Sequence, residues 1–86
     1  MANNHLDEII RHAKAGNYEA VIRICDEVIE YNPNDSLHMY SIKGKNLHKL
    51  KRYAEAIQAY NRFLEIEPDN LSVQQARMDS LNQLKN

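Results

Sequence analysis

The sequence predicts an all-α fold of five helices, arranged as two antiparallel helical hairpins and a closing helix. Apolar residues recur at helical spacing through most of the chain. Only two glycines and two prolines interrupt its 86 residues. Segments 18–33 and 53–68 also superpose without a gap, 35 residues apart, which is typical of a helical repeat. We therefore expect a short solenoid that forms a single domain.

The first hairpin is expected within residues 3–35. Its first helix covers about residues 4–14, with Asn3 or Asn4 as the N-cap. Its second helix covers residues 18–31 and carries one apolar face. The residues on this face are Tyr18, Val21, Ile22, Cys25, Val28 and Ile29.

The second hairpin is expected within residues 37–70, with Ser36 as its N-cap. Its two apolar faces are Tyr40, Gly44, Leu47 and Leu50, followed by Tyr53, Ala56, Ile57, Tyr60, Phe63 and Leu64. Pro68 ends the hairpin, because proline lacks an N–H donor and disfavours the helical conformation in the residue before it.

A last helix is expected over about residues 71–84, with Asn70 as its N-cap. Its apolar side is Val73, Met78, Leu81 and Leu84. The remaining residues are mostly polar. Such a helix is expected to cover the apolar end of a repeat stack.

The second hairpin resembles the tetratricopeptide repeat, whose pattern runs W-x2-L-G-x2-Y, then A-x3-F, then P. The corresponding residues are Tyr40, Gly44, Leu47, Ala56, Tyr60 and Pro68. Lys43 replaces the leucine of the pattern, so we expect its stem along the core edge and its ammonium in water. The resemblance extends over nearly the whole chain as two repeats and a capping helix. It implies a non-enzymatic protein–protein interaction module that holds a peptide or helical segment of a partner in a concave groove.

Basic charge is concentrated in the second hairpin. Residues 36–54 carry five Lys or Arg side chains and no Asp or Glu, a formal charge of +5, whereas the whole chain has −1. The resemblance implies that the outward side of each repeat's first helix lines the groove. The expected groove residues are His38, Ser41, Lys45, His48 and Lys49, with Leu6 and Ile10 from the first repeat. An acidic or amphipathic partner segment is therefore expected.

The first helix leaves two arrangements open. In register with the second repeat, its core positions are His5, Glu8, Ile9 and His12, while its apolar stripe is Leu6, Ile9, Ile10 and Ala13. The stripe is displaced by about 100°, one residue of helix. Either the helix shifts so that the stripe packs inward, or Leu6 and Ile10 remain on the concave side, where a partner or a second copy covers them.

Catalytic and cofactor chemistry is not expected. The sequence offers no phosphate-binding glycine loop or nucleophile with a matching base. Cys25 is expected in the core, where burial raises the pKa of a thiol. His5, Glu8 and His12 share one helical face and are considered as a metal site, but no cofactor is expected.

Two alternatives to peptide binding remain. The first is self-assembly into a homodimer or larger scaffold, because two repeats are a minimal array. The second is nucleic-acid binding through the basic helix over residues 38–52. No apolar run approaches the roughly 20 residues that span a bilayer, and residues 1–5 do not resemble a signal peptide. A cytoplasmic protein without membrane partners is therefore expected.

Overall fold

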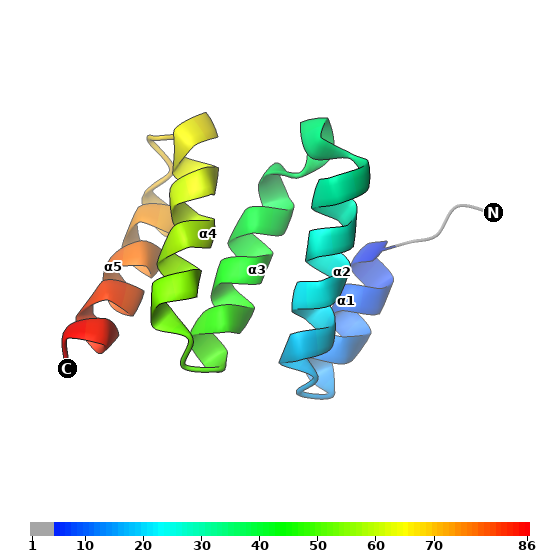
Figure 1. Cartoon of the computed structure of the whole chain (residues 1–86), viewed down its shortest axis with the longest axis horizontal. Coiled ribbons are helices and arrows are strands. Elements are labelled where there is room, and N and C mark those ends of the chain that lie inside the picture. Colours follow the sequence, from blue (N-terminus) through cyan, green and yellow to red (C-terminus); the bar gives the residue numbers. More distant parts are fainter. Residues whose placement is uncertain (1–4) are drawn as a thin grey trace.

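The described part of the chain, residues 5–86 apart from the side chain of Asp35, forms five α-helices in the computed structural model (Figure 1). They are α1 (His5–Lys14), α2 (Tyr18–Tyr31), α3 (Leu37–Lys49), α4 (Tyr53–Ile66) and α5 (Leu71–Lys85), with a short 3₁₀ helix, η1 (Pro33–Asp35). This confirms the all-α prediction. The N-cap expected at Asn3 or Asn4 lies outside the described residues. None of the helices in this range is long and apolar enough to cross a membrane.

The helices pack as a row that follows the chain. The pairs α1–α2 and α3–α4 form antiparallel hairpins, α3 also packs on α2, and α5 packs on α4 (Figure 1). The described chain measures 44 × 28 × 18 Å, and its two ends lie at opposite ends of the row (Figure 1). This is the arrangement of a small helical-repeat solenoid.

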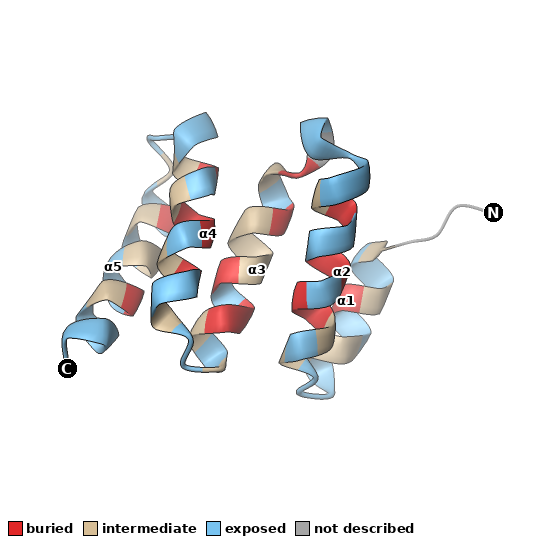
Figure 2. Ribbon diagram, in the orientation of Figure 1, coloured by how far each residue is buried: buried red, intermediate tan, exposed pale blue. Residues whose placement is uncertain are grey.

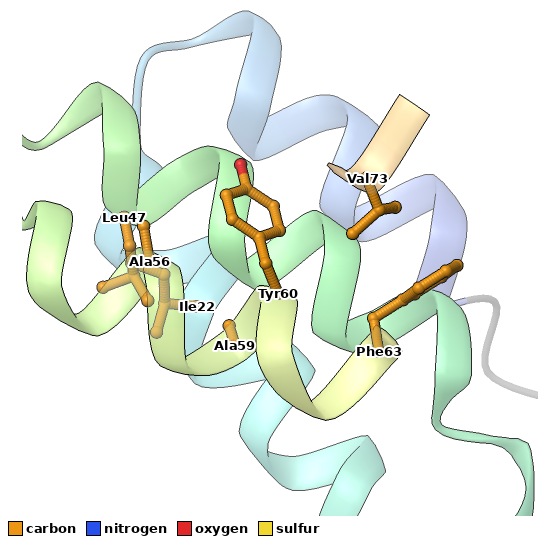
Figure 3. Close-up of a cluster of buried hydrophobic side chains, with 7 residues drawn as sticks. All are labelled: Ile22, Leu47, Ala56, Ala59, Tyr60, Phe63 and Val73. Carbon is orange, nitrogen blue, oxygen red and sulfur yellow. The ribbon is translucent and has the colours of Figure 1, made fainter. Parts of the chain in front are cut away.

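Two apolar clusters form the core, and the buried positions lie on the sides of the helices that face one another (Figure 2). The first cluster is Ile9, Val21, Ile24, Cys25, Val28 and Met39. The second is Ile22, Leu47, Ala56, Ala59, Tyr60, Phe63 and Val73 (Figure 3). Because α2 and α3 contribute to both clusters, the two hairpins are joined by apolar packing as well as by the chain.

The closest crossing joins α3 and α4 at Gly44. A Cβ atom at this position would overlap the ring of Tyr60, which is 1% exposed. Ala56 is fully buried in the same cluster. The small residues of the repeat pattern therefore lie where the two helices need them, as the sequence predicted.

The turns within the two hairpins have the same geometry, 35 residues apart. In the first turn, the N–H of Asn17 donates to the carbonyl of His12 at 2.8 Å. In the second, the N–H of Arg52 donates to the carbonyl of Leu47 at 2.9 Å. Gly16 in the first turn and Lys51 in the second both have positive φ, 79° and 63°. The repeat period seen in the sequence is thus also a period of backbone conformation.

One of the two predicted helix caps is wrong. The side chain of Asn70 accepts a hydrogen bond from the N–H of Val73 at 3.0 Å, as expected of an N-cap. Ser36 occupies the N-cap position of α3 but makes no cap hydrogen bond. Its hydroxyl donates instead to the carbonyl of Pro33 at 2.7 Å, because η1 brings that carbonyl within reach.

The expected apolar side of α5 is also only partly buried. Val73 packs into the core, but Met78 and Leu84 are 47% and 52% exposed. Small residues make the contact instead, since Ser80 is fully buried and Ala76 packs against the core. A helix can approach closely through such small side chains, so the apolar stripe did not decide which face turned inward.

Replacing Gly44 by Ala is expected to lower the free energy of unfolding by about 1–3 kcal/mol, because the added methyl group must displace the Tyr60 ring. Urea unfolding followed by circular dichroism measures the change. Ser41→Ala, on the opposite side of α3, is the matched control and should stay within about 0.5 kcal/mol. An unchanged stability of the Gly44 variant would contradict the close crossing.

Candidate functional site

The groove side of α3 borders a socket of about 230 Å³ between α3 and α5. Its lining residues are Lys45, His48 and Lys49 from α3, Tyr60 from α4, and Ala76 and Asp79 from α5. We call this the α3–α5 socket. It brings together three of the predicted groove residues and is smaller than the roughly 300–1,000 Å³ of sites for drug-sized ligands. It is large enough for one side chain of a bound segment.

His48 is tied into the structure rather than left in solvent. Its Nδ1 atom is hydrogen-bonded to Ser80 Oγ of α5 at 2.7 Å. Its ring also meets Tyr53 edge-on, with ring centroids 5.0 Å apart. His48 thus joins α3 to α5 at one wall of the α3–α5 socket and leaves one ring nitrogen, Nε2, without this partner.

The two groove lysines differ in their surroundings. The Lys49 ammonium lies 5.2 Å from the centroid of the Tyr18 ring, a cation–π distance. Lys45 is exposed and has no ion pair within residues 5–86. Lys45 is therefore the cation at the α3–α5 socket that a ligand carboxylate can reach without displacing an aromatic contact.

His38 and Ser41 lie nearer the start of α3 and do not line the α3–α5 socket. The Ser41 hydroxyl donates to the carbonyl of His38 at 3.1 Å, within its own helix. His38 is exposed. The structure therefore places these two predicted groove residues on the same helix as Lys45 but outside the hollow.

The first helix keeps the register of the repeat. Ile9 is buried, whereas Leu6 and Ile10 are 53% and 49% exposed. The inward shift of the apolar stripe, one of the two arrangements considered, is therefore wrong. After the 35-residue offset, Leu6 and Ile10 correspond to Ser41 and Lys45, which places them in the same row as the α3 groove residues.

The histidines of α1 do not assemble a metal site. Within residues 5–86, no group of three or more His, Cys, Asp or Glu side chains is arranged to hold a metal ion. His5, Glu8 and His12 are each half-buried. His5 and His12 are separated by seven residues, about 10 Å along a helix axis, whereas ligands must lie about 2.1 Å from one zinc ion.

Two cations of the basic stretch are neutralised by neighbouring carboxylates. Lys43 Nζ lies 2.6 Å from Asp26 Oδ1 on α2, so its ammonium is paired and not simply hydrated as expected. Arg52 donates two hydrogen bonds, of 2.8 and 2.7 Å, to Glu55, and these lower the pKa of that carboxyl group. Fewer free cations remain for a nucleic-acid backbone than the sequence suggested.

Sequence reasoning missed the polar groups that α4 and α5 bring to the α3–α5 socket. Burial, and secondarily the charge of Asp79, raise the pKa of Tyr60 to about 12, so its hydroxyl is a donor at neutral pH. Asp79 lies 34 residues after Lys45, and the starts of α3 and α5 are 34 residues apart as well. This second offset was the available signal, because it places Asp79 at the Lys45 position of α5.

The stacked hairpins and the close glycine crossing define a helical-repeat protein. Comparison with known families matches residues 39–70, most of α3 through the start of α5, to the tetratricopeptide repeat. Together with the five-helix architecture, this match identifies the chain as a tetratricopeptide-type repeat protein. No curated protein and no solved structure matches it significantly. Repeats of this family are generally non-catalytic, and the match indicates a protein–protein interaction module.

Cys25 is expected to be unreactive in the folded protein. The residue is fully buried, and burial raises the pKa of its thiol to about 12, so little nucleophilic thiolate is present. We expect a thiol-reactive dye at mildly alkaline pH to label the protein only in denaturant. Labelling of the native protein as fast as that of a short cysteine peptide would contradict this environment.

Proposed function

We propose that the chain acts as one domain, two repeats closed by α5, that binds an acidic or amphipathic segment of a partner protein in its concave groove. The observation that carries the proposal is Lys45, an exposed cation without an ion pair at the rim of the α3–α5 socket. A partner carboxylate gains a charge-assisted contact there. No catalytic role is proposed.

Equivalent positions on the three outward helices support an amphipathic ligand. Ile10 on α1, Lys45 on α3 and Asp79 on α5 are related by offsets of 35 and 34 residues. The row is thus apolar, then cationic, then anionic. A segment that crosses it would place an apolar side chain over α1 and a carboxylate over α3, which distinguishes it from a uniformly acidic ligand.

The proposed affinity is modest. The groove is formed by only three helices, and small interfaces of this kind are typical of transient complexes. We expect dissociation constants on the order of micromolar, which corresponds to about −8 kcal/mol. A multivalent ligand would bind more tightly without any new contact.

Self-association is a second candidate, favoured by apolar side chains at both ends of the row. Leu6 and Ile10 on α1, and Met78 and Leu84 on α5, are each about half exposed. A second copy that covers either pair would remove apolar area from water. In this case the assembly itself, rather than a foreign peptide, would occupy these faces.

Replacing both Lys45 and Lys49 by Glu is expected to abolish binding of acidic peptides, because attraction at the groove becomes repulsion. The probe is a capped synthetic peptide library randomised over leucine, glutamate, glutamine and serine, measured by fluorescence anisotropy. The double variant should remain folded, since both lysines are exposed.

The matched control replaces Lys51 and Lys85 by Glu, which changes the net charge equally but lies in the α3–α4 turn and at the end of α5. This control should bind the library as the parent protein does. Equal loss in both variants would indicate a general charge effect. Full binding by the Lys45 and Lys49 variant would refute the groove assignment.

Light scattering over a wide concentration range is expected to give the mass of a single chain, because the proposed groove must be free to receive a partner. A concentration-dependent dimer would favour the second candidate. Replacing Leu6 and Ile10 by Ser, and separately Met78 and Leu84 by Ser, would then show which end is covered, since loss of the apolar contacts weakens the interface that uses them.

A further inference from the structure

The Tyr60 hydroxyl lies at the floor of the α3–α5 socket without a partner. The residue is 1% exposed, yet within residues 5–86 its hydroxyl makes no hydrogen bond. Figure 3 shows the oxygen directed away from Ala59 and Phe63, the neighbouring apolar side chains of α4. A buried hydroxyl without a partner is costly, so a ligand group that pairs with it gains more than a contact at an exposed site would give.

Packing does not explain this hydroxyl. The repeat pattern has phenylalanine at this position, and the tyrosine ring alone fills the space beside Gly44. The oxygen is therefore an addition that this chain makes at the floor of its groove.

A hydrogen-bond acceptor stands on the facing helix. The Asp79 carboxylate of α5 lines the same socket, and its Oδ1 atom accepts a hydrogen bond from Gln75 at 2.9 Å. It makes no hydrogen bond to Tyr60 within the described residues. The socket thus offers one donor and one acceptor, beside the apolar methyl group of Ala76.

We propose that the α3–α5 socket is a specificity pocket for one glutamine or asparagine side chain of the bound segment. The carboxamide oxygen accepts from the Tyr60 hydroxyl, and the carboxamide N–H₂ donates to Asp79. The aliphatic stem lies along Ala76. A neighbouring acidic residue of the same segment pairs with Lys45 at the rim, so this inference rests on the proposed groove function.

Two observations favour a side-chain carboxamide over other groups. The floor belongs to α4, behind α3 and α5, so a ligand must insert a side chain between these helices and cannot reach it with its backbone. A carboxylate would satisfy Tyr60 but face the negative charge of Asp79, whereas an ammonium would satisfy Asp79 but leave the Tyr60 donor unpaired. A carboxamide pairs with both.

The experiment selects the tightest peptides from the capped leucine, glutamate, glutamine and serine library and then changes one position at a time. We expect a glutamine beside a glutamate in the selected peptides. Changing that glutamine to methionine, which keeps its length but removes the amide, should weaken binding roughly 3- to 10-fold, as expected for one or two neutral hydrogen bonds.

Tyr60→Phe should weaken the glutamine peptide by a similar factor and leave the methionine peptide unchanged. Its fold should be retained, because phenylalanine is the residue of the repeat pattern, and urea unfolding checks this. Tyr40→Phe, on the other side of α3, is the matched control. Asp79→Asn should shift the preference from glutamine towards glutamate at the same peptide position, because the repelling charge is removed.

The outcomes separate this inference from the proposed function. If Lys45 and Lys49 are required but Tyr60→Phe binds both peptides like the parent protein, the groove assignment holds and the specificity pocket is refuted. Selection of glutamate or leucine at the anchoring position would refute it as well. Binding that needs Tyr60 but not the lysines would support the pocket and refute the acidic-segment proposal.

Discussion

The close approach of α3 and α4 at Gly44 is the constraint on which the rest of the structure depends. Because no side chain separates the two helices there, the Tyr60 ring packs directly against α3. The same cluster then receives Val73 of α5, so α5 takes its place against the α4 side of this crossing. The hollow between α3 and α5, with a tyrosine hydroxyl at its floor, is therefore a product of core packing rather than of surface residues alone.

The elements predicted correctly are those whose chemistry is local or periodic. Asn70 caps its own helix through a residue three positions away, and the two turns repeat because their sequences lie one period apart. The cap at Ser36 failed because a carbonyl of the 3₁₀ helix competes for the same hydroxyl. The inner face of α5 was misjudged because close packing through Ser80 outweighed the burial of Met78.

The candidate site was predictable on one helix and not between helices. Helical periodicity places Lys45, His48 and Lys49 on one side of α3 whatever surrounds them. It contains no information about the residue that meets them, so the His48–Ser80 hydrogen bond and the Lys43–Asp26 ion pair were not foreseen. The depth of the socket depends on a third helix, α4, whose tyrosine had been assigned to the core alone.

The division of the core into two apolar clusters has a consequence for dynamics. The α1 helix packs chiefly on α2, whereas α3 is held by neighbours on both sides. Opening is thus easiest at the α1 end, where the fewest contacts must be broken before backbone amides meet solvent. A partner that covers Leu6 and Ile10 would bind to this end and to no open form of it, so part of its binding free energy would be observed as slower amide exchange in α1.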